Sequence, residues 1–341
     1  MFNVFVTNRC NLSCQYCYEG QNKLQDNFTP EKIDLLLKFM EKYNVRGDSV
    51  PVNFHGGEPL LEIDCIEEIS RRVKEKYVTA GLSVTTNGTV MSERIAKVLI
   101  DTGMEITVSI DGRKESHDRY RIYHDGMGSH EVVMKNIKFL QEMGATNLRY
   151  RLTFDSETVK DLAENIVYLA ENNIKNVVPA PNYFDIGWND NSIEIFKKNI
   201  LKLRKIKEKN KDFSLYIPYT DGYEIKPKGL CRGGLGSYHI SANGDIYPCS
   251  YVVGNINYKI GTLQNGINNK KIEVLNCIYE KEVSECSGCS YGKYCVGSRC
   301  KFLNEKIGGE LHHAVPIICE LENVMYEYVF LYRQKHIKVN N

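Results

Sequence analysis

The sequence lacks a long apolar segment, an excess of charge of one sign and a signal peptide. None of its apolar runs approaches the ~20 residues of a membrane-spanning helix, so no membrane span is expected. The 44 basic and 43 acidic residues give a net charge of +1, which argues against nucleic acid or an anionic membrane as partner. The opening MFNVFV is too short for a signal peptide and has no basic flank. These absences favour a cytoplasmic protein.

Cysteine, in contrast, is abundant, and its distribution is uneven. Three of the 12 cysteines lie in residues 10–17, one is Cys65, and eight lie between residues 231 and 319. A reducing cytoplasm disfavours disulfides, so metal binding or redox chemistry is the leading explanation. A secreted protein stapled by disulfides is the weaker alternative.

The first 210 residues of the 341 alternate between strand and helix patterns. Such alternation predicts a parallel sheet with helical crossovers, either an open doubly wound sheet or a partial barrel. Both place chemistry at the carboxyl ends of the strands, where Cys10 and the HGGEP stretch fall. The predicted strands are Phe2–Thr7, Pro51–His55, Leu82–Thr86, Glu105–Ile110, Asn147–Phe154 and Asn176–Pro179. The predicted helices begin at Pro30 and Ser92 and span Ile63–Tyr77, Glu131–Met143, Lys160–Asn172 and Ser192–Lys209.

From about residue 215 the pattern changes, because Gly, Tyr and Cys become frequent and apolar runs shorten. The stretch GLCRGGLGSYHISANGDIYPCS predicts a hairpin that turns at Asn243-Gly244. A small domain held by metal is expected here, followed by a helix over Ile318–Lys335. The expected division is therefore residues 1–212 and residues 213–341.

The first cysteine group reads CNLSCQYC and has the spacing C-x3-C-x2-C, formed by Cys10, Cys14 and Cys17. Thiolates hold iron–sulfur clusters, and three of them leave the fourth iron of a cubane to another ligand. On spacing alone, a zinc site completed by a distant residue is the alternative.

This motif after a first strand, with Tyr16 before the last cysteine, resembles the radical S-adenosylmethionine (SAM) superfamily. The resemblance implies a partial (β/α)6 barrel and a [4Fe-4S] cluster whose unique iron binds SAM. It also implies reductive cleavage of SAM to a deoxyadenosyl radical that abstracts hydrogen from a substrate.

Four further motifs match the same family in order. HGGEP resembles the stretch that receives the SAM amino group, where glycine lets backbone approach the ligand and Glu58 can accept a charge-assisted hydrogen bond. TTNG resembles the stretch that contacts the ribose of SAM. VSIDG and HDRYR resemble the stretches that contact the SAM carboxylate. Arg149 and Arg151 are alternatives to the second arginine of HDRYR as the residue that binds this carboxylate. The implied cofactor-binding residues are Tyr16, Gly56, Gly57, Glu58, Thr86, Asn87, Ser109 and Arg121.

The later cysteines resemble the SPASM extension of radical SAM enzymes, which carries two auxiliary [4Fe-4S] clusters. The resemblance covers the C-terminal third, with one departure: four residues, VGSR, stand between Cys295 and Cys300 where three are usual. Cys277 or a substrate thiol is the candidate for the missing fourth ligand of the inner cluster, whereas Cys65 is expected in the core. The implied ligands are Cys286, Cys289, Cys295 and Cys319 for the outer cluster, and Cys231, Cys249 and Cys300 for the inner one.

SPASM relatives largely modify peptides and proteins, so the leading hypothesis is a ribosomal-peptide maturase that forms a crosslink such as a thioether. Anaerobic sulfatase maturation is the alternative, but in that group an aspartate follows the cysteine that matches Cys249, and here Ser250 stands there. Acid–base candidates are Asp111, His55 and Tyr183, each of which can equally be a structural strand-end residue.

The expected partners are a peptide or protein substrate and an external electron donor such as flavodoxin or ferredoxin. Many relatives have a leader-binding domain before the barrel, and this chain opens on its first strand, so a substrate leader is expected to dock elsewhere or through a separate leader-binding protein. The resemblance also implies oxygen sensitivity. The hypothesis from another class is a non-catalytic zinc or iron–sulfur binding module.

Overall fold

The structure is a computed structural model of the chain and describes residues 1–20, 26–209, 227 and 229–331. It contains two compact units built from interleaved segments. The first comprises Met1–Ser109, Tyr120–Leu148 and Arg232–Cys277, and the second Ile110–Arg119, Arg149–Cys231 and Ile278–Asn341. The expected division at residue 212 concerns domain families and stays a prediction.

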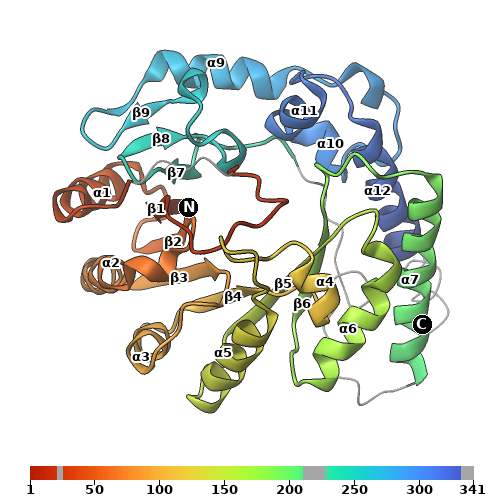
Figure 1. Cartoon of the computed structure of the whole chain (residues 1–341). Helices are drawn as coiled ribbons and strands as arrows, with labels where there is room; N and C mark the ends of the chain where they lie inside the picture. Colours follow the sequence, from red (N-terminus) through yellow and green to blue (C-terminus); the bar gives the residue numbers. More distant parts are fainter. Residues whose placement is uncertain (21–25, 210–226, 228, 332–341) are drawn as a thin grey trace, which may run out of the picture. The chain divides into compact units, whose positions relative to one another are not determined.

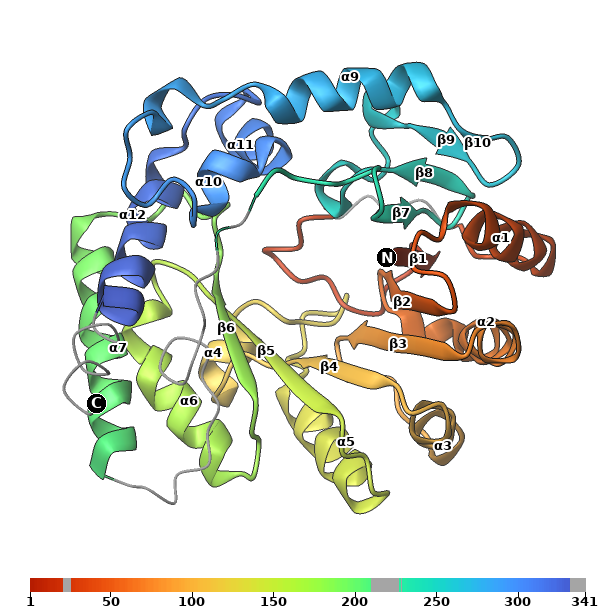
Figure 2. The same cartoon turned by 180° about the vertical axis from the view of Figure 1, so that it is seen from behind.

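In the first unit, β1 (Phe2–Thr7), β2 (Ser49–Gly56), β3 (Thr79–Thr86) and β4 (Glu105–Ser109) lie parallel and in sequence order. All six residues of β1 are buried, because sheet neighbours flank the strand and its apolar side chains are covered on both faces. Figures 1 and 2 show the helices beside their strands in the same order. These helices are α1 (Pro30–Tyr43), α2 (Ile63–Lys76), α3 (Glu93–Asp101) and α5 (His130–Glu142).

The expected hairpin forms and adds to this same sheet. β7 (Tyr238–Ile240) and β8 (Asp245–Tyr247) pair antiparallel, and Gly244 in the turn between them has φ of +91°. β7 also pairs parallel with β1, with Asn3 opposite His239. The C-terminal third therefore supplies the neighbour of the first strand. Figure 1 shows α9 (Asn269–Glu280) beside β8 and β9, a helix that sequence patterns did not reveal. The short elements here are β9 (Gly261–Thr262), β10 (Gly266–Ile267), η1 (Pro59–Glu62), η3 (Ser250–Val252) and η4 (Ile256–Tyr258).

In the second unit, β5 (Leu148–Phe154) and β6 (Val177–Pro181) pair parallel. Tyr183, which follows β6, donates a hydrogen bond from its hydroxyl to Glu322 Oε1 at 3.1 Å, and Arg204 of α7 contacts the carbonyl of Tyr328. The expected last helix begins as α12 and continues as η6; residues 332–335 of the prediction lie outside the described residues. The helices are α4 (Lys114–Asp118), η2 (Val159–Asp161), α6 (Leu162–Glu171), α7 (Asp190–Lys209), η5 (Ser284–Cys286), α10 (Val296–Arg299), α11 (Lys301–Gly308), α12 (Pro316–Met325) and η6 (Tyr326–Leu331).

Together these elements confirm the α/β class with a parallel sheet. In the part of the chain that the structure describes, no helix combines the length and apolar character that crossing a membrane requires.

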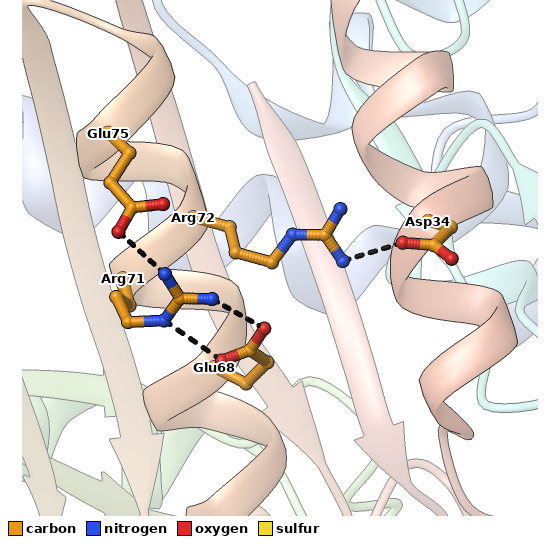
Figure 3. Close-up of polar contacts among 5 residues, drawn as sticks. All are labelled: Asp34, Glu68, Arg71, Arg72 and Glu75. Atoms are coloured by element: carbon orange, nitrogen blue, oxygen red, sulfur yellow. Dashed lines mark hydrogen bonds and ion pairs between the residues drawn. The ribbon is translucent and has the colours of Figure 1, made fainter.

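Ion pairs tie the outer surfaces of α1 and α2. Arg72 of α2 reaches Asp34 of α1 at 2.6 Å, whereas Arg71 binds Glu68 and Glu75 within its own helix (Figure 3). These side chains are largely exposed, so salt screens the pairs and their contribution to stability is small. The hydrophobic contribution of α2 to stability comes from its buried face, which includes Ile66, Ile69 and Val73.

Candidate functional site

The three cysteines of the first motif lie on one loop after β1, and each is half-buried. The loop turns tightly, because the Cys17 N–H donates to the Cys14 carbonyl at 3.1 Å. The HDRYR segment holds it from outside: the N–H groups of Ser13 and Gln15 donate to the carbonyls of Ile122 and Tyr120. Backbone hydrogen bonds within the loop and to the segment Tyr120–Ile122 therefore set its course.

This loop presents a donor set suited to an iron–sulfur cluster. None of its three cysteines is in a disulfide, and Asn87 Nδ2 lies 3.8 Å from Cys10 Sγ, within hydrogen-bonding range of a sulfur acceptor. No three His, Cys, Asp or Glu side chains among the described residues converge as a site for one metal ion would require. A cubane makes a different demand, one thiolate for each of three separate irons. With a cluster and SAM bound, the loop would supply the radical chemistry described above.

The two glycines of HGGEP are required by the chain itself. A Cβ on Gly57 would lie 2.2 Å from the Arg9 carbonyl oxygen, and one on Gly56 would lie 2.2 Å from that of Thr7. The Gly57 and Glu58 N–H groups donate to the Thr7 and Arg9 carbonyls at 3.0 and 2.8 Å. The glycines therefore let the start of the cysteine loop run directly against the end of β2. Their expected contact with SAM stays a prediction.

Glu58 is fully buried and bridges the ends of two strands. Its carboxylate accepts hydrogen bonds from the Thr86 hydroxyl at 2.7 Å, the Asn87 N–H at 2.7 Å and the Leu60 N–H at 3.0 Å. Burial of a carboxylate is tolerated here because donors surround it. The expected contact of Glu58 with an ammonium stays a prediction, next to this structural role.

We expect Glu58→Gln to lower the free energy of unfolding by about 2 kcal/mol, because an amide NH2 would then face N–H and O–H donors. Urea unfolding of the metal-free protein measures the change. Glu62→Gln is the control, since Glu62 pairs with Arg9 at an exposed site. Equal stability of the two variants would contradict the bridging role.

TTNG connects the end of β3 to the cysteine loop. Asn87 donates from Nδ2 to Asn11 Oδ1 at 3.0 Å and accepts from the Thr89 N–H and hydroxyl. Thr86 and Asn87 are both buried. The structure thus brings TTNG beside Cys10, as the motif order predicts, and the expected ribose contact remains untested.

The expected carboxylate-binding residues Ser109 and Arg121 are also buried, at 9% and 7% exposure. The Arg121 guanidinium lies 5.2 Å from the centre of the Tyr16 ring, a cation–π distance. Arg121 therefore reaches the cysteine loop at Tyr16. The rivals Arg149 and Arg151 are exposed and belong to the second unit.

The acid–base candidates have different surroundings. Asp111 is buried and its carboxylate accepts the Thr153 N–H at 2.8 Å, whereas the Tyr183 hydroxyl donates to Glu322. Both have structural partners. His55 differs, because its Nδ1 lies 3.8 Å from Glu19 Oε1 at the cysteine loop. Sequence reasoning missed Glu19, which no motif marks.

An aromatic pair links the first motif to Cys249. The Tyr18 and Tyr251 rings pack edge to face with centres 5.9 Å apart. Burial raises the pKa of the Tyr18 phenol well above its usual value, and the nearby acidic groups Glu19, Cys17, Tyr251 and Cys249 raise it further. Tyr18 is therefore a neutral phenol at neutral pH, beside both cysteines.

The four cysteines expected to hold an outer cluster lie in one region of the second unit. Burial raises the pKa values of the Cys286, Cys295 and Cys319 thiols, and in each case a neighbouring thiol of the group raises the value further. Cys286, Cys289 and Cys295 line a cavity of about 580 Å³. Their proximity fits a cluster, although the ligand assignment stays a prediction.

The extra residue between Cys295 and Cys300 is absorbed by a helical turn. The four residues VGSR form α10; the Cys295 sulfur accepts the Gly297 N–H at 3.2 Å and the Cys300 N–H donates to the Val296 carbonyl. Cys300 has Cys231 as an acidic neighbour. Cys277 is exposed on α9, and its part in the inner cluster is untested, as is that of Cys249.

Residues 4–169 match the Radical SAM superfamily model. The cysteine-type anaerobic sulfatase-maturating enzyme of Clostridium novyi (strain NT) is 28% identical over 294 residues, covering 76% of this chain and 75% of that protein. The enzyme of the same name from Clostridium perfringens (strain 13 / Type A) is 25% identical and covers 94% of this chain and 93% of its own length.

Solved structures match across nearly the whole chain. Native anSMEcpe with bound AdoMet gives a TM-score of 0.82 at 18% identity and covers 99% of both chains. Streptococcus suis SuiB bound to S-adenosylmethionine gives 0.64 at 18% identity, covering 93% of this chain and 76% of that one. These likenesses confirm the fold. Because the matched residues include all three cysteines of C-x3-C-x2-C, residues 4–169 form a radical SAM domain, and the chain is an enzyme.

Proposed function

We propose that this enzyme abstracts hydrogen from a residue of a peptide or protein substrate. The relatives named above as sulfatase-maturating enzymes support this, because their names describe protein modification and they match most of the chain. The radical would form at Cys10, Cys14 and Cys17, with SAM held by the residues of the four motifs. An external electron donor such as flavodoxin or ferredoxin, and a separate leader-binding protein, belong to the same proposal.

The product we favour is a crosslink within the substrate, such as a thioether. The observation that carries this choice is Ser250, whose hydroxyl cannot act as a base unaided at the position after Cys249. A crosslink also suits the proposed inner cluster. Its three cysteine ligands, Cys231, Cys249 and Cys300, would leave one iron open to a substrate thiol.

Sulfatase maturation is the second candidate. The near-complete coverage of the C. perfringens relative favours it. It would need a proton acceptor other than residue 250, and His55 beside Glu19 is the described group that could serve. The two candidates therefore predict different products from one cysteine-containing peptide.

A peptide assay separates them. The anaerobically reconstituted enzyme would receive SAM, dithionite and a sulfatase-derived or cysteine-rich peptide deuterated at the α and β carbons. Deuterium in the released deoxyadenosine is expected. A crosslinked peptide loses two hydrogens and its thiol no longer reacts with iodoacetamide, whereas sulfatase maturation removes sulfur and leaves an aldehyde. Deoxyadenosine without deuterium from any peptide would overturn the proposal.

The auxiliary clusters make a separate prediction. Three cubanes hold about twelve irons, and Cys286→Ala should lose about four of them. Cys277→Ser, a change at an exposed cysteine outside the outer group, should retain the iron of that group. Iron and acid-labile sulfide assays measure both. A wild type that binds zinc and holds no sulfide would instead support the binding-module alternative.

A further inference from the structure

Lys301 is a lysine in an unusual place. It begins α11 directly after Cys300, and only 3% of it is exposed. Lysine is almost never buried this fully without charged partners. The groups around Lys301 therefore indicate the function of its ammonium.

Lys301 lies near cysteines of both later groups. Its Nζ donates to the Ser298 carbonyl at 2.9 Å, the one acceptor it has among the described residues. An ammonium has three donors, so two remain. Lys301 lines the same cavity as Cys286, Cys289 and Cys295. Glu282 lines this cavity too, and Cys300 of the inner group directly precedes Lys301. Burial lowers the pKa of the Lys301 ammonium, whereas the nearby acidic groups Cys286, Glu282 and Cys300 raise it.

We propose that Lys301 is the shared counter-charge of the two auxiliary clusters and sets the reduction potential of each. The proposal rests on the cluster assignment proposed above. Net charge and hydrogen bonds at the sulfurs set the potentials of iron–sulfur clusters. A buried cation beside two thiolate groups stabilises the reduced, more negative state of each, because little water screens it. Lys301 is a tuning residue and touches no substrate.

The test isolates the auxiliary clusters in a Cys10→Ala/Cys14→Ala/Cys17→Ala background, without SAM. Potentiometric titration followed by electron paramagnetic resonance gives two midpoint potentials. Lys301→Met is expected to lower both, whereas Lys301→Arg, which keeps the charge, should leave them near the parent values. Lys293→Met is the matched control, because Lys293 lines the same cavity but is exposed.

The midpoint potentials and the iron contents of these variants show whether Lys301 has the proposed role. Unchanged potentials in Lys301→Met, or a shift of one cluster only, overturns the shared role. If the Lys301→Met variant loses auxiliary iron, the titration uses Lys301→Gln in its place. Loss of auxiliary iron in both variants would show that Lys301 has a structural role and would overturn the proposal. If the triple-alanine parent itself holds no iron, the cluster assignment fails, and this proposal fails with it. If the parent holds iron and only the lysine variants behave otherwise than expected, this proposal alone fails.

Discussion

Replacement of Cys14 by alanine is expected to abolish the formation of deoxyadenosine from SAM. The radical-generating cluster depends on three thiolates, and a loop with two of them leaves one more iron without a protein ligand. The protein would be reconstituted without oxygen and reduced with dithionite, and deoxyadenosine would be measured by chromatography. The variant should also hold about four irons fewer than the wild type.

The control is Cys277→Ser, which removes one thiol at an exposed site of α9. This variant should still release deoxyadenosine, because Cys277 lies outside the first motif. Deoxyadenosine from Cys14→Ala at the wild-type rate would show that the first motif does not hold the radical-generating cluster. Loss in both variants would point to general damage from thiol removal.

Replacement of Gly57 by alanine is expected to cost about 3 kcal/mol of stability and to disable the site. The added Cβ would lie 2.2 Å from the Arg9 oxygen and 2.6 Å from the Arg9 carbonyl carbon. Both atoms are backbone, so a side-chain rotation cannot relieve the overlap. The start of the cysteine loop must move, and Cys10 follows Arg9 directly. Deoxyadenosine release should therefore fall together with the melting temperature.

Gly81→Ala is the matched control, since it adds the same atom to the same sheet. Its Cβ would meet only Pro51 Cα at 3.9 Å, an ordinary contact. Differential scanning calorimetry of the two metal-free variants gives the comparison. Similar melting temperatures would mean that the loop yields at little cost, and that close approach is not why glycine is needed at residue 57.

Local patterns predicted the alternating strands and helices of the parallel sheet well, because apolar periodicity and helix caps are properties of neighbouring residues. Ser92, for example, caps α3 by accepting the Ile95 N–H, and Pro30 opens α1. The Asn243-Gly244 turn was predictable for the same reason. Family motifs likewise marked Cys10 and Asn87, which the fold brings together.

What sequence could not predict depends on contacts between distant segments. The pairing of β7 with β1, the donors around Glu58 and the packing of Tyr18 on Tyr251 all join residues far apart in the chain. Glu19 lies in no motif, and only its short distance to His55 in the fold marks it as a candidate site residue. The crowding of Gly57 by the Arg9 backbone was not predictable either, because the two residues are 48 positions apart in the chain.

The pairing of β1 with β7 has a consequence for biosynthesis. Asn3 and Tyr238 are 235 residues apart, yet the Tyr238 N–H donates to the Met1 carbonyl and the Met1 ammonium contacts Gly236. One edge of the first strand therefore stays unpaired until more than two thirds of the chain has left the ribosome. An unpaired apolar edge is a site of misassociation, and such distant pairing slows folding. Overexpression is then expected to be limited by events during translation, before any iron is delivered.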